Sequence, residues 1–293
     1  MHHHQLNLFN SLDFQIISSN PGLSRPFLKW VGGKRRLIPQ LEKYIPKTFK
    51  AYYEPFLGGG AVFFHLLPQS GVLTDINEDL INTYCAVRDD VNSLIQLLWE
   101  HQQNHERSPQ QYYYQIRESY SRNNLARTAR AASFIYLNKT CFNGLYRVNS
   151  KGEFNVPLGS YKKPKICNTE LLISVSNQLK NATIETKPFT HVLNHATADD
   201  FVYFDPPYHP ISSTSNFTSY SRDGFSEKNQ LELRDTFEKL AEKGVKVMLS
   251  NSDCQFIREI YAGFNIHKIW AGRSINSRGD KRGKISEVLI TNY

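Results

Sequence analysis

The chain lacks the residue patterns of several protein classes. No apolar run approaches the ~20 residues of a membrane-spanning helix, and the start, Met1–Gln5, lacks the basic and apolar stretches of a secretion signal. Four cysteines stand apart, without the spacing of a zinc site or of a disulfide framework. These absences predict a cytoplasmic protein with reduced thiols, no membrane partner and no metal.

The balance of charge is also one-sided. Lys and Arg number 35 against 27 Asp and Glu, which gives a formal net charge of +8 and a pI of about 9.2. Such an excess favours a polyanionic partner, although a merely basic soluble protein would show the same balance. Basic residues recur beside aromatic and amide side chains, which favours nucleic acid. With 293 residues, 40% of them apolar, the chain can form one large domain, or one domain with an insert.

Short β-rich runs alternate with helical patterns on either side of a long interruption. This alternation is typical of a mostly parallel sheet covered on both faces, here closed by an antiparallel hairpin. We expect an N-terminal extension (1–26), a catalytic domain (27–89 and 168–293) and a mostly helical insert (90–167) that ends in a loop and hairpin (138–165). The expected strands are 51–56, 71–74, 201–204, 245–250, 265–270 and 285–291, and the expected helices are 35–43, 61–67, 78–88, 91–102, 109–120, 125–137 and 228–243.

Two glycine-rich segments have the pattern of a nucleoside site. The first, Glu54–Gly60, lies between a strand and a helix, where glycines let the backbone approach a ligand closely. The next strand ends in Asp75, whose carboxylate can accept both hydroxyls of a ribose. A tight turn without a ligand and a helix N-cap are the alternatives for these two features. No Gly-Lys-Ser or Gly-Lys-Thr follows the glycines, which argues against ATP or GTP.

The second segment, Phe27–Lys34, pairs two glycines with an aromatic and a basic side chain just before a helix. Trp30 could lie against an adenine or the methionine part of a cofactor. Lys34 could meet a carboxylate of the cofactor or fix acids nearby. Each residue alone would be interpreted as a buried tryptophan or a solvated lysine, but their pairing with Gly32 and Gly33 favours a site.

The run Asp205-Pro206-Pro207-Tyr208 follows the apolar strand 201–204 and suits amino-group methylation. Asp205 and the carbonyl of Pro206 can accept the two hydrogens of an adenine N6 amino group. Two acceptors in fixed directions localise the nitrogen lone pair for attack on a sulfonium methyl, and proline fixes the direction of the backbone. Tyr208 can stack on a base that has left the duplex. A Pro-Pro turn that ends a strand is the alternative.

These motifs, read in order, resemble those of the Dam-type DNA adenine-N6 methyltransferases. The matching segments are FLKWVGGK, YYEPFLGGGA, LTDINEDLI, NKTCFNGLYRVNSKGEFNVPLG and YFDPPY, and the resemblance runs from about Phe27 to Tyr293. It implies a Rossmann-like S-adenosylmethionine domain with an inserted target-recognition domain, acting on adenine in GATC. It also implies cofactor contacts at Trp30, Lys34, Phe56, Gly58, Asp75 and Asp205, and a catalytic loop at Asp205, Pro206, Pro207 and Tyr208.

The insert resembles the GATC-reading members of that family at its centre, Phe142–Arg147. Arg147 is the expected reader of a guanine, because a guanidinium fork matches O6 and N7 in the major groove. Phe142 falls where the family often has an aromatic wedge, and Asn143, Leu145 and Pro157 are expected helpers. Phosphate contacts are expected at Lys139, Asn155, Lys162 and Ser212, although each could be an ordinary solvated residue. Many relatives carry an Asp-Phe pair before the catalytic strand, whereas here Phe189 follows Pro188.

The sequence therefore predicts a DNA adenine-N6 methyltransferase that uses S-adenosylmethionine on double-stranded DNA. One alternative is the same chemistry on RNA or on a glutamine side chain of a protein. Another is a DNA-binding protein without catalysis, against which the intact motifs count. A monomer is compatible with the sequence, and both membership of a restriction–modification pair and independent action stay open.

Overall fold

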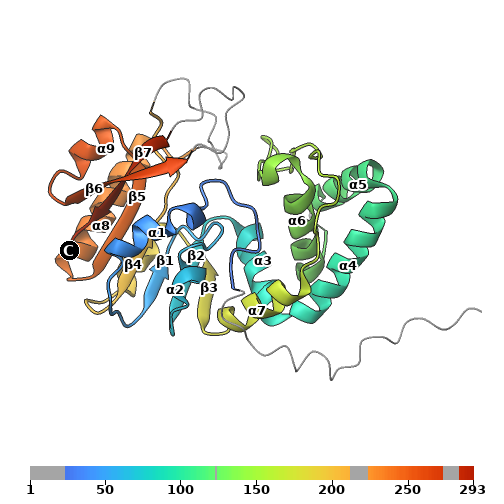
Figure 1. The fold of residues 1–293 in the computed structure, drawn as a ribbon, viewed down its shortest axis with the longest axis horizontal. Coiled ribbons are helices and arrows are strands. Elements are labelled where there is room, and N and C mark those ends of the chain that lie inside the picture. Colours follow the sequence, from blue (N-terminus) through green and yellow to red (C-terminus); the bar gives the residue numbers. More distant parts are fainter. Residues whose placement is uncertain (1–23, 123, 212–223, 273–283) are drawn as a thin grey trace, which may run out of the picture.

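The computed structural model describes residues 24–122, 124–211, 224–272 and 284–293, which form a mixed α/β fold around a seven-stranded sheet (Figure 1). Five neighbouring strands are parallel, and β7 runs antiparallel to β5 and β6. In spatial order the strands are β3 (Ala182–Thr186), β2 (Gly71–Asp75), β1 (Tyr52–Glu54), β4 (Phe201–Phe204), β5 (Lys246–Ser252), β7 (Lys284–Thr291) and β6 (Asn265–Gly272). The predicted mostly parallel sheet with a closing antiparallel pair is thereby confirmed.

Apolar residues on both faces of the sheet produce two packed layers. In β4, Phe201 and Tyr203 face one layer while Val202 and Phe204 face the other, as the two-residue period of a strand requires. The first layer contains α3 (Glu78–Asp89) and α7 (Thr169–Leu179), and the second contains α8 (Glu227–Glu242) and α9 (Gln255–Ile260). Burial on both faces explains why β4 is a continuous apolar run.

The strand order reverses between β1 and β4, at the centre of the sheet. β1 pairs with β2 on one side and with β4 on the other. The sheet continues from β2 to β3 toward one edge and from β4 to β5 toward the opposite edge. In an open parallel sheet, ligands bind outside the carboxyl ends of strands at such a reversal. Here those ends carry Glu54, Asp75 and Asp205.

Three helices between α3 and α7 form the part of the chain predicted as an insert. These are α4 (Val91–Arg107), α5 (Pro109–Ser121) and α6 (Arg127–Thr140), and they lie together at the end of the molecule opposite β6 (Figure 1). The hairpin expected over 138–165 is reduced to two isolated bridges, Cys141 with Leu158 and Val148 with Phe154. Asn143 and Gly144 both adopt positive φ and fold this segment back on itself, so a regular ladder does not form.

Two short helices differ from the expected ranges. The helix expected over 35–43 is reduced to α1 (Ile38–Leu41) between 3-10 turns, with Pro39 in its first turn. The helix expected over 61–67 is a single turn, α2 (Phe63–Leu66), which ends where Leu67 adopts a left-handed conformation. Gly58 and Gly60 adopt positive φ just before α2, so the residues that precede Phe63 form turns instead of the first turn of a helix.

Candidate active site

A cavity of about 570 Å³ lies at the carboxyl ends of β1, β2 and β4. It brings together both glycine-rich segments and the catalytic run that the sequence predicts. Glu287 of β7 also reaches it. The lining includes Trp30, Lys34, Glu54, Phe56, Gly58, Asp75, Phe189, Asp205, Pro206, Pro207, Tyr208 and Glu287.

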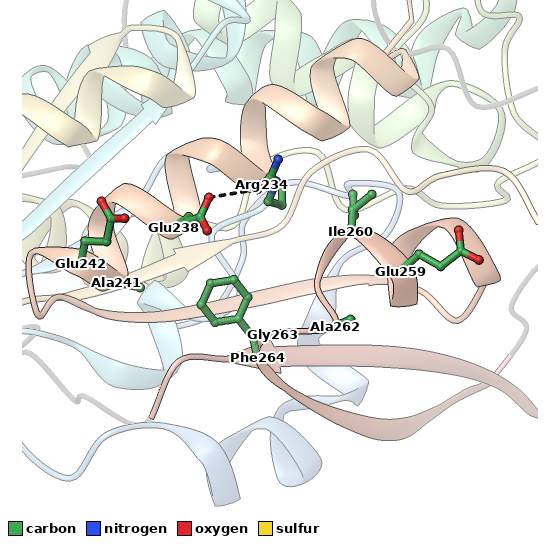
Figure 2. Close-up of a pocket in the computed structure, with 9 residues that line it drawn as sticks. All are labelled: Arg234, Glu238, Ala241, Glu242, Glu259, Ile260, Ala262, Gly263 and Phe264. Atoms are coloured by element: carbon green, nitrogen blue, oxygen red, sulfur yellow. Dashed lines mark hydrogen bonds and ion pairs between the residues drawn. The ribbon is translucent and has the colours of Figure 1, made fainter.

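A second depression, of about 420 Å³, lies between α8, α9 and the start of β6 (Figure 2). Arg234, the basic residue in its lining, already pairs with two acidic side chains. Arg234 binds Glu238 at 2.9 Å and Asp235 at 2.9 Å, and the first of these pairs is dashed in Figure 2. None of the described site residues predicted from the sequence lines it, so we place the site in the larger cavity.

Asp75 occupies the position expected of a ribose-binding carboxylate. Its two oxygens accept the backbone N–H groups of Gly58 at 3.1 Å and Asn77 at 3.0 Å. Asn77, not Asp75, caps α3, because its side chain accepts the N–H of Leu80. Burial raises the pKa of Asp75. Each carboxylate oxygen keeps a second lone pair, so the group can still accept hydroxyl donors that would stabilise its charge.

The two glycine-rich segments are in direct contact. Gly58 adopts a φ of +46°, and a Cβ there would lie 2.8 Å from Cδ1 of Trp30. Trp30 in turn packs with its ring stacked at 6.0 Å from Tyr146 of the insert. Phe56 stacks on Phe189 at 5.4 Å, and both rings line the cavity. The aromatic rings of Trp30, Phe56 and Phe189 therefore line the cavity beside the turn at Gly58, where a larger residue would clash with Trp30.

Asp205 is paired with the buried Lys34 at the tip of β4. The lysine ammonium lies 2.6 Å from Oδ1 of Asp205 and donates a hydrogen bond to the carbonyl of Gly32 at 2.7 Å. No well-directed hydrogen bond reaches Oδ1 from the described residues, although the ion pair is short, so this oxygen can accept from a ligand. Burial raises the pKa of Asp205, and Lys34 opposes that rise. The ion pair thus favours the anionic form of Asp205 in spite of its burial.

Glu54 is a second buried carboxyl beside this pair. Its Oε2 accepts the hydroxyl of Tyr52 at 2.9 Å and the N–H of Phe63 at 3.1 Å. Burial raises the pKa of Glu54 to about 8, with a further rise from Asp205 and an opposing effect of Lys34. Glu54 is therefore mostly neutral at pH 7, and Lys34 is left to pair with Asp205.

This titration predicts a pH dependence of stability that Glu54→Gln removes. The pKa of Glu54 rises from 4.5 to about 8 on folding. The folded state therefore binds the proton more tightly, and stability falls as pH rises between those two values. The variant keeps an acceptor for Tyr52 and Phe63. We expect its melting temperature, measured between about pH 5 and pH 9, to decline less than that of the native protein. Parallel declines in the two proteins would show that Glu54 does not titrate in this range.

The catalytic run is held by buried amides that the sequence did not point to. Gln230 of α8 donates to the carbonyl of Pro207 at 3.0 Å, and Asn251 of β5 donates to Gln230 at 3.0 Å. Asn251 also accepts the N–H of His209 at 3.1 Å. These bonds fix the backbone after Pro206, which itself lines the cavity.

The loop after α6 brings most of the predicted DNA-contacting residues together. Phe142 is 49% exposed, and its N–H donates to the carbonyl of Pro157 at 2.9 Å. Arg147 is exposed, and its Nε and Nη2 donate to the side chain and carbonyl of Asn155 at 2.7 and 3.2 Å. Asn143, Pro157 and Lys162 are also exposed, and Leu145 is half-buried.

Three of the predicted phosphate contacts differ from the exposed residues of this loop. The ammonium of Lys139 donates inward to the carbonyl of Phe27, and burial lowers its pKa to about 8, so the structure does not bring it to the exposed loop. The side-chain oxygen and the carbonyl of Asn155 accept hydrogen bonds from Arg147, so Asn155 also supports the residue expected to contact a guanine. Ser212 lies outside the described residues.

The helices α5 and α6 and the loop after α6 are joined to α3 through Asp79. Its carboxylate accepts Nε of Arg130 at 2.5 Å, Nη2 of Arg130 at 2.8 Å, the hydroxyl of Tyr120 at 2.5 Å and that of Tyr146 at 3.4 Å. Neighbouring residues in sequence give no hint of this cluster, since Arg130 is 51 residues from Asp79. It fixes the loop that carries Arg147 relative to Asp75.

Within the described ranges, no helix is both long and apolar enough to cross a membrane. In the same residues no cluster of three or more His, Cys, Asp or Glu side chains is arranged to hold a metal ion.

Comparison with known proteins agrees with this geometry. The D12 class N6 adenine-specific DNA methyltransferase family matches residues 30–275. The type II methyltransferase M1.LlaDCHI of Lactococcus lactis subsp. cremoris is 47% identical over 283 residues, which is 95% of this chain and 99% of that protein. The type II methyltransferase M.MjaIII of Methanocaldococcus jannaschii is 46% identical over 92% of this chain and 99% of its own length. The DNA adenine methylase of Escherichia coli K12 is 37% identical over 91% of this chain and 94% of its own length.

The predicted resemblance to adenine-N6 methyltransferases is thereby confirmed, and action on RNA or protein is not favoured. With the cavity, the Asp-Pro-Pro-Tyr run and these relatives taken together, the chain belongs to the D12 class of N6 adenine-specific DNA methyltransferases.

Proposed function

We propose that this enzyme transfers the methyl group of S-adenosylmethionine to N6 of adenine in the duplex sequence GATC. The observation that carries the proposal is the position of Asp205, which lies in one cavity with Asp75, Gly58 and Trp30. A carboxylate for an amino group and a carboxylate for a ribose thus border the same space.

The residues present fit S-adenosylmethionine. Asp75 offers free lone pairs to ribose hydroxyls, and Gly58 leaves room where a Cβ would strike Trp30. The stacked rings of Phe56 and Phe189 offer an apolar wall for a flat base. Lys34 is the cation available to the carboxylate end of the cofactor, although its contact with Asp205 competes for it. When bound, this cofactor supplies an electrophilic methyl group.

The protein's own part in the reaction is to orient and polarise the adenine. Asp205 and the Pro206 carbonyl accept the two N6 hydrogens, which localises the nitrogen lone pair toward the methyl group. Tyr208 stacks on the unpaired base and compensates part of the cost of unstacking, a few kcal/mol.

Methyl transfer to short duplexes tests the proposal directly. Purified enzyme is incubated with labelled S-adenosylmethionine and with duplexes that contain GATC or a permuted site such as GTAC. Digestion with a methylation-sensitive and a methylation-dependent GATC nuclease then gives the site independently. Labelling of all duplexes alike would refute the sequence specificity, and absence of labelling by a folded enzyme would favour a DNA-binding protein without catalysis.

Arg147→Ala should relax the preference at one base pair. Asn155 accepts hydrogen bonds from Nε and Nη2 of Arg147. The edge of the guanidinium formed by Nη1 and the second Nη2 hydrogen can therefore donate to O6 and N7 of a guanine. We expect a loss of about 1–3 kcal/mol in discrimination at that position, measured as kcat/KM on single-substitution duplexes. Lys162→Ala is the matched control, because the loss of an exposed charge should weaken all duplexes alike and reduce the salt dependence. A uniform loss for Arg147→Ala as well would make Arg147 a phosphate contact.

A further inference from the structure

We propose that Glu287 is a positioning residue that fixes the ring plane of Tyr208 for stacking on the target adenine. The inference rests on the proposed function, because it assigns Tyr208 to the unstacked base. It assigns a role in the site to a residue of β7 that lies outside the Asp-Pro-Pro-Tyr run.

Glu287 is a carboxylate that directly precedes the apolar part of β7. Val288, Leu289 and Ile290, which follow it in β7, are completely buried. β7 lies between β5 and β6, and Glu287 is opposite Ser252 on one side and Ile269 on the other. A side chain with a charge is costly at such a place unless it has a partner. Glu287 lies on the same face as Leu289, since residues two apart in a strand point the same way, and it lines the cavity.

The partner is the hydroxyl of Tyr208, which donates to Oε2 of Glu287 at 2.8 Å. This bond joins residues 79 positions apart. Burial raises the pKa of Glu287, and the charge of Lys34 and the bond from Tyr208 oppose that rise. Both groups are partly buried, and a hydrogen bond to a charged acceptor is stronger than one between neutral groups.

Two further contacts restrain Tyr208, one at its ring and one at the backbone directly before it. The ammonium of Lys34 lies over one face of Tyr208, 4.7 Å from the ring centroid. Gln230 fixes the carbonyl of Pro207 directly before it. The bond to Glu287 therefore removes the remaining freedom, which is rotation and tilt of the phenol. Lys34 covers one ring face, and Tyr208 is one of the residues that line the cavity.

A fixed plane matters because stacking depends on parallel rings at close contact. A phenol that swings loses that contact in part of its conformations, and the extruded adenine is then held less well. Removing the acceptor should reduce the fraction of target base held in the site and the rate of methyl transfer. It should leave cofactor affinity unchanged, since Asp75 and Gly58 lie at another wall.

The test compares Tyr208→Phe, Glu287→Ala, Glu287→Gln and the double variant of the first two. Single-turnover methylation gives the rate, and a duplex with 2-aminopurine at the target adenine gives base extrusion by fluorescence. Isothermal titration with S-adenosylmethionine gives cofactor affinity. Glu259→Ala, at an exposed glutamate of α9, is the control and should behave as native.

We expect Tyr208→Phe and Glu287→Ala each to lower the rate and the fluorescence signal by about 5–20-fold, since each removes one charge-assisted hydrogen bond. The double variant should be no slower than the slower single variant, because both changes remove the same bond. Glu287→Gln keeps an acceptor oxygen and should lie within about 3-fold of native. Cofactor affinity should stay native in all of them.

Several results would overturn the inference. A native rate for Tyr208→Phe would show that the bond has no effect, even if Glu287→Ala proved too unstable to assay. If the fold-losses in rate of the two single variants multiplied in the double variant, the two residues would act independently. A fall in cofactor affinity that matches the fall in rate would make Glu287 a cofactor ligand. Failure of the native enzyme to methylate or extrude adenine would instead refute the proposed function, and this inference with it.

Discussion

Asp205→Ala should abolish methyl transfer while DNA binding stays measurable. The variant removes the acceptor that polarises the amino group and the charge that Lys34 pairs with. We expect kcat to fall by about 10³-fold, near the upper end of what single preorganised electrostatic groups contribute. Single-turnover labelling of a GATC duplex measures the rate, and a gel shift measures binding. Retained turnover would remove Asp205 from the mechanism.

Asp205→Asn controls for the fold. Asp205→Ala leaves Lys34 buried without its partner, which by itself destabilises a protein. Asparagine keeps an oxygen near Lys34 and an acceptor in the cavity but loses the charge. We therefore expect a native-like melting curve with an intermediate rate. If both variants lost only stability and kept their rate after correction for folded protein, the carboxylate would be structural.

Asp75→Ala should weaken cofactor binding far more than it slows the chemical step. Two hydroxyl donors to a carboxylate contribute about 1.5–3 kcal/mol each, so a loss of about 10²–10³-fold in affinity is expected. Isothermal titration with S-adenosylmethionine gives the affinity. At saturating cofactor, kcat should stay within about 10-fold of native, because Asp75 does not touch the reacting atoms.

The backbone contacts of Asp75 call for a matched variant. Alanine removes the acceptors for the N–H groups of Gly58 and Asn77 as well as those for a ribose. Asp75→Asn retains one acceptor oxygen, and it should bind cofactor more tightly than Asp75→Ala but less tightly than native. Equal cofactor affinity in all three proteins would exclude Asp75 from the site.

Much of the site could be predicted because its chemistry is local in sequence. Asp205 follows an apolar run that is buried on both faces, and Asp75 ends β2, the strand that comes after the glycine-rich turn Gly58–Gly60 in the chain. Parallel strands end at one edge of a sheet, so residues at their ends must meet. The strand β3 and the helices α7 and α9 were not predicted, because their short patterns have no strong boundary signal.

The groups that support the site could not be predicted in the same way. Glu287, Gln230 and Asn251 contact the catalytic run from three different elements, and nothing in their neighbours distinguishes them from ordinary polar residues. Lys139 was expected at a phosphate because it is basic and lies near the recognition loop. The direction of its side chain depends on the carbonyl of Phe27, which is 112 residues away.

The place of β7 in the sheet has a consequence for biosynthesis. It is the last strand in chain order, yet it lies between β5 and β6. As the polypeptide leaves the ribosome, β6 has no partner in the sheet until β7 enters. Glu287 arrives on that same strand, so the tyrosine of the catalytic loop gains its acceptor only once every other strand has been translated. A nascent chain stalled before this point would lack the acceptor that holds the hydroxyl of Tyr208.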